Sequence, residues 1–377
     1  MTLVASYEIG NWPVVVGDIM VSGLVPKQDT RPLNIPTYEN ANIRVSETSN
    51  RIVSGLLQKV NCLGAQLVLA WSGSSICARS VFRDILRQNS TPTFHDAVRV
   101  LNERQNENGM DLYLTGISIE AVQGPAQQST RFAWDSEAGW NTKHRYFSKY
   151  NNCLAGGTGS DAFLDLLSLP IVDQPAQKSP MEMAICQSLG FLAKLTGDQI
   201  RTGVGIDETF FGGAFELATM FRGQIQKVGD ISYHFWEARS EPSGDISMMP
   251  HVALKVEYFE DYLIIRKVSF GGQVADALGA NEIYIIRPVH RTIDEAERKR
   301  LIASVPRPSM NARFAALYVH MPEKRAPHDC YVAVHKSGKE YWNGQIFFEE
   351  DGNGLDMRIH SDTLQRVQRA LLPATGG

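Results

Sequence analysis

The first residues of the chain carry the pattern of a β-hairpin. Residues 2–6 and 12–17 are rich in apolar and β-branched residues, and residues 8–11 between them include the Gly and Asn of a tight turn. Asp18 ends the second run, and Pro, Asn, Gln and charged residues then dominate residues 23–36, as in a loop. The pattern predicts two antiparallel strands at the N-terminus, with Asp18 at the end of the second.

Helical periodicity is found further along the chain. Apolar residues recur at three- and four-residue steps in residues 74–88 and 180–197, and a third helix is expected to start near Asp161. Ser74 or Ser75 can cap the first of these helices, because a serine oxygen accepts a hydrogen bond from a free N–H of the first turn. Strands are expected around these helices, at residues 65–71, 111–121, 210–220 and 231–236.

The last third of the chain is predicted to be mainly β-structure. A polar segment with Pro and Gly, residues 238–245, marks the expected boundary between a domain over residues 1–240 and a β-rich appendage over residues 241–377. An amphipathic helix is expected near residues 364–372. The first 240 residues therefore predict an α+β layout in which antiparallel sheets lie between helices. The strands expected in the appendage are residues 252–258, 262–268, 282–286, 314–320 and 330–335.

Composition excludes several classes of protein. A hydrophobic fraction of 43% is enough for a sizeable core, and a net charge of −4 argues against nucleic acid as the main partner. The longest uncharged apolar stretch, residues 60–71, is too short to span a bilayer, so no membrane partner is expected. The five cysteines lack CxxC spacing, and the first basic residue is Lys27, so we expect free thiols, no secretory signal and a cytoplasmic location.

The sequence contains no motif for a metal or a cofactor. The nine histidines show neither HxH nor HExxH spacing, which argues against a catalytic metal. Residues 156–160 resemble a phosphate-binding loop, but no Gly-Lys-Ser/Thr follows them, so a nucleotide has little support. The glycine-rich residues 211–216 before a strand are interpreted as a bulge or a close backbone approach, and not as a cofactor site. We therefore expect neither a metal nor a cofactor.

Thr2 is the most informative candidate for chemistry. Methionine aminopeptidases tolerate a small residue after Met1, so removal of Met1 would leave a free N-terminal threonine. Such a residue holds a nucleophile and a base together, since its hydroxyl can attack while its amine accepts the proton. The amine suits this role because its unperturbed pKa of roughly 8 lies near neutral pH.

Residues 2–22 resemble the N-terminal hairpin of proteasome β-type subunits and their bacterial relatives, which belong to the N-terminal nucleophile (Ntn) hydrolases. Asp18 follows Thr2 by sixteen positions, and Lys59 precedes Gly73 by fourteen, as in that family. The turn with Thr158 and Ser160 resembles the Gly-Ser-Gly-Ser turn that begins a family helix. The nearest counterpart of the family's late Arg-Asp-x-x-Ser-Gly motif contains Asp198, with one residue too many, and Met20 replaces the family's arginine.

The resemblance implies a four-layer αββα sandwich with a β-rich C-terminal extension, and a threonine-type peptidase or amidohydrolase activity. In this scheme Thr2 attacks an amide carbonyl, the Gly73 N–H steadies the oxyanion, and Asp18 orients Lys59, whose charge lowers the proton affinity of the threonine. Thr158, Ser160 and Asp198 complete the implied site. The implied partners are a peptide or small amide substrate and further copies of the same chain.

Other interpretations of the same residues remain open. Asp18 can end a strand, Lys59 can be a solvated side chain at a helix end, and Gly73 can serve tight packing alone. Two alternative functions follow. One is a catalytically inactive scaffold or binding protein with the same fold, and the other is an enzyme that acts on a small-molecule amide.

Overall fold

The computed structural model accounts for most of the chain. The described residues are 2–24, 33–38, 44–45, 51–121, 127–140, 145–147, 150–168, 179–202, 211–270, 278–324, 330–336, 346–351 and 354–371.

The expected N-terminal hairpin is confirmed and lies at the centre of the first sheet. β1 (Val4–Ile9) and β2 (Trp12–Asp18) pair antiparallel, and Gly10 and Asn11 turn between them with positive φ angles. The strand order of this sheet is β11-β12-β1-β2-β13-β14. Its other strands are β11 (Arg145–Phe147), β12 (Tyr150–Gly156), β13 (Phe215–Phe221) and β14 (Gln224–Lys227).

A second antiparallel sheet packs against one face of the first. Val4 and Val15 of the first sheet meet Val68 and Ile117 of the second in a buried hydrophobic cluster between the two sheets. The strand order of the second sheet is β10-β9-β8-β7-β6. Its strands are β6 (Val60–Cys62), β7 (Leu67–Gly73), β8 (Leu112–Ala121), β9 (Gln127–Asp135) and β10 (Gly139–Trp140).

Two helices cover the other face of the second sheet. α1 (Ser75–Gln88) begins after Ser74, whose side chain accepts a hydrogen bond from the Cys77 N–H, so the expected cap is confirmed. α2 (Phe94–Arg104) was not expected from the sequence, although Thr93 and Asp96 form a capping box at its start.

The C-terminal part of the chain forms a third sheet with the order β18-β17-β16-β15-β19-β20. β15 pairs parallel with β19 and antiparallel with β16, and the expected boundary after residue 240 falls at the end of β15, before the turn to β16. α6 (Ser361–Leu371), which corresponds to the helix expected near residues 364–372, packs on this sheet. The strands are β15 (Ile231–Ser240), β16 (Ile246–Phe259), β17 (Tyr262–Phe270), β18 (Leu278–Ile286), β19 (Phe314–His320) and β20 (Cys330–Lys336).

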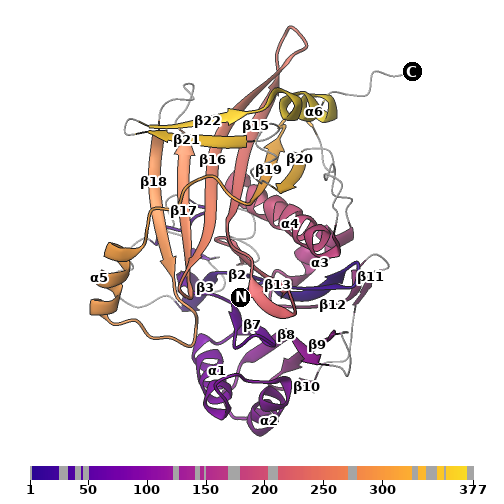
Figure 1. The fold of residues 1–377 in the computed structure, drawn as a ribbon, viewed down its shortest axis with the longest axis vertical. Helices are drawn as coiled ribbons and strands as arrows, with labels where there is room; N and C mark the ends of the chain where they lie inside the picture. The colour runs from indigo at the N-terminus through magenta and orange to yellow at the C-terminus, as the bar shows by residue number, and fades with distance from the viewer. Residues whose placement is uncertain are drawn as a thin grey trace.

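The remaining elements are small and lie around these sheets. α5 (Glu295–Ser304), which was not expected, lies in the chain between β18 and β19 of the third sheet (Figure 1). The small sheets consist of β3 (Met20–Leu24), β4 (Arg44–Val45) and β5 (Arg51–Leu56), and of β21 (Ile346–Asp351) and β22 (Gly354–Ile359). No helix in the described ranges is both long and apolar enough to cross a membrane.

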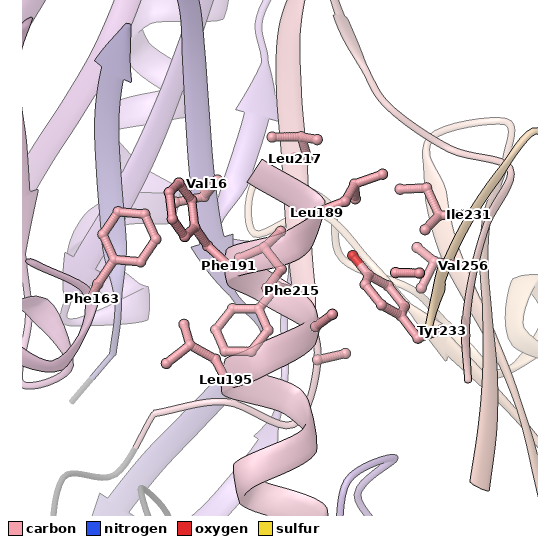
Figure 2. Close-up of a cluster of buried hydrophobic side chains, with 14 of the residues drawn as sticks. Val16, Phe163, Leu189, Phe191, Leu195, Phe215, Leu217, Ile231, Tyr233 and Val256 are labelled. Carbon is pink, nitrogen blue, oxygen red and sulfur yellow. The ribbon is translucent and has the colours of Figure 1, made fainter. Parts of the chain in front are cut away.

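α4 (Pro180–Thr202) lies between the first and third sheets and shares one hydrophobic core with both. Figure 2 shows Val16 and Phe163 on one side of this helix, and Ile231, Tyr233 and Val256 on the other. The shorter α3 (Ser160–Ser168) packs beside α4 against β12. α4 therefore joins the third sheet to the first, because one side of the helix packs on each sheet (Figure 1).

The predicted four-layer αββα sandwich is wrong. The structure is 45% strand and 28% helix, with several antiparallel sheets and six helices in its described part, and it is a β-rich fold. The physical reason is the third sheet, which covers the face of α4 that a four-layer sandwich would leave in water. The residues after 240 contribute to this common core through Phe314 and Ala316 of β19.

Shortening a side chain of α4 is expected to destabilise the whole protein. Leu189 is fully buried in the core shared by the two sheets, so Leu189→Ala should lower the free energy of unfolding by about 2–5 kcal/mol. Urea unfolding followed by circular dichroism measures this loss. Ile302→Ala on α5, where the side chain is 62% exposed, is the control and should change stability by less than about 0.5 kcal/mol. Equal effects of the two substitutions would contradict the interior position of α4.

Candidate functional site

The ends of the first hairpin bring Thr2 and Asp18 together. The Asp18 N–H donates a hydrogen bond to the Leu3 carbonyl over 2.9 Å, so the start of one strand faces the end of the other. The Thr2 hydroxyl donates a hydrogen bond to Oδ1 of Asp18, and the Leu3 N–H donates to the same oxygen over 3.1 Å. Both Thr2 and Asp18 are fully buried. The sequence analysis assigned Thr2 and Asp18 to one site, and the structure places the two side chains in direct contact.

Lys59 enters the same cluster from the second sheet side. A Cβ at Gly17 would lie only 2.9 Å from the Lys59 Cβ, so the glycine before Asp18 permits this close approach. The Lys59 side chain is almost completely buried, and its Nζ lies 4.0 Å from the centre of the Trp71 ring. Such a cation–π contact partly replaces the water that the ammonium group has lost.

Burial shifts both charged groups of the cluster toward their neutral forms. Loss of water raises the pKa of Asp18, while the Lys59 charge and the hydrogen bonds from Thr2, Gly212 and Leu3 oppose the shift. Burial likewise lowers the pKa of Lys59 to about 8, although the charges of Asp18 and Glu216 oppose it. Lys59 is thus a group that can change its charge near neutral pH.

The turn between β12 and α3 lies directly against Thr2. The Gly159 N–H donates to the Thr2 carbonyl over 3.1 Å. Gly157 has a φ angle of +88°, and a Cβ there would lie 2.1 Å from the same carbonyl oxygen, so only glycine fits. Thr158 is exposed in this turn, and Ser160 begins α3. Thr158 and Ser160 therefore belong to the turn that contacts Thr2. Their chemical roles stay predictions.

Gly73 has a conformational reason to be glycine. It ends β7 with a φ angle of +97°, and a Cβ there would lie 2.5 Å from the Asp111 carbonyl oxygen. The next residue, Ser74, donates its N–H to that oxygen over 2.7 Å and caps α1. The use of the Gly73 N–H as an oxyanion donor stays a prediction.

Asp198 is not part of the Thr2 cluster. Its carboxylate accepts hydrogen bonds from Lys194 Nζ, at 2.9 and 2.8 Å, and from the Tyr318 hydroxyl, at 3.0 Å. Tyr318 belongs to β19, so Asp198 joins α4 to the third sheet. The hydrogen-bond partners of Asp198 thus lie outside the predicted site, and they give this residue a structural role.

The neighbouring Gln199 acts on the cluster instead, through the backbone of residues 211–213. Its side chain donates to the Phe211 carbonyl over 2.9 Å and accepts from the Gly213 N–H over 3.3 Å. The Gly212 N–H between them donates to Oδ2 of Asp18 over 2.8 Å. A Cβ at Gly212 would lie 2.0 Å from the side-chain amide of Gln199, so the close neighbour of this glycine is a side chain and not a second backbone.

Glu216 is a functional candidate that the sequence analysis missed. Its side chain has no exposed surface, and Oε2 accepts the backbone N–H groups of Lys59 and Val60 over 2.6 and 3.0 Å. Oε1 accepts from Lys227 Nζ over 2.8 Å and from the Tyr258 hydroxyl over 3.3 Å. The carboxylate therefore fixes the backbone that carries Lys59. The one signal for Glu216 in the sequence was the presence of an acidic residue inside an apolar strand.

The described residues contain no group of three or more His, Cys, Asp or Glu side chains arranged to hold a metal ion. The cluster around Thr2 consists of one hydroxyl, one carboxylate, one ammonium group and several backbone N–H groups. These are the groups of acid–base and acyl-transfer chemistry.

Comparison of the chain with models of known protein families finds no match, and comparison with curated protein sequences finds none that is significantly similar. The interpretation of the site therefore rests on its own geometry.

Proposed function

We propose that the protein hydrolyses amide bonds with Thr2 as an N-terminal nucleophile, after removal of Met1. The observation that carries this proposal is the hydrogen bond from the Thr2 hydroxyl to Asp18, beside the buried Lys59. A threonine hydroxyl is a weak nucleophile unless neighbouring charges favour its deprotonated form. The buried ammonium group of Lys59 supplies such a charge, and Asp18 is its counter-ion. The relation to Ntn hydrolases is part of this proposal, at the level of the site residues.

The proposed reaction has two steps. Thr2 Oγ bonds to the carbonyl carbon, its proton moves to the Thr2 amine, and this proton leaves with the departing amine as the C–N bond breaks. Water then attacks the resulting ester, which releases the acid and restores the threonine. The substrate is a peptide or a small-molecule amide. We further propose that the protein acts in the cytoplasm, where its five cysteines, which form no disulfide with one another in the structure, stay reduced.

Intact-mass spectrometry of the untagged protein, before and after treatment with a threonine-reactive β-lactone, tests the proposal. We expect loss of Met1 and a single adduct of one intact lactone, because ring opening by Thr2 Oγ releases no leaving group. Thr2→Ala should abolish the adduct, and Thr37→Ala, at another buried threonine, should not. We also propose that the protein forms a homo-oligomer, and size-exclusion chromatography with light scattering on the same sample tests this.

One observation favours the alternative of an inactive scaffold or binding protein. Thr2 has no exposed surface, so a substrate can reach it only after Met1 is removed or the surrounding chain moves. Complete retention of Met1, or lactone adducts that persist in Thr2→Ala, would reject the catalytic proposal in favour of this alternative.

The pH dependence of lactone modification is expected to be bell-shaped. The rate should rise toward pH 8 as the Thr2 amine loses its proton, and fall above about pH 8 as Lys59 loses its charge. Lys59→Met should react slowly and show no falling limb. A rate that keeps rising to pH 10 in the unmodified sequence would contradict the role of Lys59.

The lowered pKa of Lys59 also predicts how the stability of the protein depends on pH. The folded protein releases the Lys59 proton near pH 8, whereas the unfolded chain holds it up to its ordinary value of 10.5. The unfolded state therefore binds more protons between these values, so the contribution of Lys59 to stability should increase as pH rises through this window. The difference in the free energy of unfolding between the unmodified protein and Lys59→Met gives the contribution of Lys59. The tyrosines that titrate above pH 10 are common to both proteins and cancel in this difference.

A further inference from the structure

Three arginines gather where α1 meets the turn that follows β18, and we call Arg79, Arg83 and Arg287 the arginine cluster. Arg79 and Arg83 lie one helical turn apart, so their side chains leave the same face of α1. Their Nε–H groups donate to the backbone carbonyls of residues 289 and 290, each over 3.0 Å. Arg287 donates through Nη1 to the carbonyl of residue 291. The three guanidinium groups are thus bound to three successive carbonyls of one turn.

No carboxylate balances the charge of the arginine cluster. In the part of the chain that the structure describes, no carboxylate oxygen lies within 4.0 Å of these three guanidinium groups. Asp294 and Glu295 share a cavity with Arg287 but do not pair with it, and Asp294 caps α5 instead. The other acids of this region are paired elsewhere, Asp84 with Arg87 and Arg104, and Asp261 with Arg291.

The positive charges of the arginine cluster act on one another. All three residues are half-buried, so water screens their charges incompletely, yet each has surface that a solute can reach. Burial lowers the pKa of Arg287, and the charges of Arg79 and Arg83 lower it further, although Tyr262 opposes the shift. An anion that binds here relieves this repulsion, so the gathered charges favour a negatively charged ligand.

We propose that the arginine cluster binds a phosphate group. Each guanidinium carries five N–H donors in a planar fork, and the described structure uses one of them on a backbone carbonyl. These carbonyl contacts also restrain the side chains, so less rotamer freedom is lost when a ligand binds. The remaining N–H groups suit phosphate, to which arginine forms paired, charge-assisted hydrogen bonds.

The number of arginines favours phosphate over a carboxylate. A phosphate monoester carries a charge of about −1.5 to −2 at pH 7 and three acceptor oxygens. A carboxylate has a single charge and two oxygens, and so leaves part of the cluster unbalanced. Free phosphate and the phosphate monoester of a small molecule share the required chemistry.

Isothermal titration of the full-length protein tests this site, in a phosphate-free buffer with NaCl to hold the ionic strength constant. Inorganic phosphate should bind about tenfold or more tightly than acetate. Arg83→Gln and Arg287→Gln should each weaken phosphate binding by about tenfold or more, because each removes one charge and one fork. Arg99→Gln, which removes the same charge from an exposed position on α2, is the control and should change the affinity by less than about twofold.

Phenyl phosphate in the same titration distinguishes the two sources of the phosphate group. Tighter binding of phenyl phosphate than of inorganic phosphate would identify a phosphate monoester as the ligand. Phenyl phosphate that binds no more tightly would identify free phosphate.

Thermal unfolding provides a second measurement if a substitution weakens the fold. A ligand that binds only the folded state raises Tm, so phosphate should raise the Tm of the unmodified protein more than that of Arg83→Gln or Arg287→Gln. The general stabilisation by phosphate as a salt acts on all variants and cancels in this comparison. Equal affinity for phosphate and acetate, or equal weakening by Arg99→Gln and Arg287→Gln, would overturn the proposal. Absence of binding heat, with the same rise in Tm in all variants, would also overturn it.

Discussion

Glu216→Ala is expected to lower the free energy of unfolding by about 3–5 kcal/mol, the loss typical of breaking a buried ion pair by removing one partner. The substitution leaves the Lys227 ammonium group without its carboxylate, and the backbone N–H groups of Lys59 and Val60 without an acceptor. It also removes the partner of the Tyr258 hydroxyl, which ties the third sheet to the first. Urea unfolding at pH 7 measures the loss.

Two comparisons make this result specific. Glu216→Gln retains one oxygen for the backbone N–H groups but loses the charge opposite Lys227, so a smaller loss is expected. Glu237→Ala removes a carboxylate that is paired on the surface with Arg239, and should change stability by less than about 1 kcal/mol. A Glu216→Ala protein as stable as Glu237→Ala would show that the buried carboxylate does not hold the site together.

Asp18→Ala is expected to reduce the rate of lactone modification of Thr2 by roughly a hundredfold or more, the size of effect seen when one electrostatic group is removed from an active site. The carboxylate accepts the Thr2 hydroxyl and the Gly212 N–H, and its charge raises the pKa of Lys59. Without it the pKa of Lys59 falls further below its ordinary value. The buried lysine then loses its charge at a lower pH.

The control for this experiment is Asp198→Asn. The structure places Asp198 beside Lys194 and Tyr318, so its substitution should leave the rate within about twofold although some stability is lost. The falling limb of the pH profile should also move to lower pH in Asp18→Ala and not in Asp198→Asn. A larger rate loss in Asp198→Asn than in Asp18→Ala would reverse the assignment made from the structure.

The part of the site that is local in sequence could be predicted. Thr2 and Asp18 lie at the two ends of one hairpin, and the turn fixes the register that brings them together. Gln199 and Asp198 show the limit of this reasoning, because one position along a helix changes the facing direction by about 100°. Glu216 could not be found in this way, since its partners are remote in sequence and its importance lies in the N–H groups that it satisfies.

The fold was predicted element by element with more success than as a whole. β1, β2, β7, α1 and the strands of the third sheet follow from local apolar periodicity. The arrangement of layers depends on which faces are covered, and α4 is apolar on more than one face, with Cys186, Phe191 and Ala193 buried beside the periodic leucines. A helix that is apolar on several sides is typical of an interior position. That signal was present in the sequence, but periodicity alone did not separate it from an ordinary amphipathic helix.

The interior position of α4 has a consequence for synthesis on the ribosome. One side of the helix packs on β2 and the other on β19 and β20, strands near opposite ends of the chain. A nascent chain that has emerged only as far as residue 240 has therefore made the helix with β15 but without β19 and β20, which also cover its second side. Until residues 314–336 leave the ribosome, this apolar side is open to chaperones and to other nascent chains. Completion of the core is thus a late event in translation.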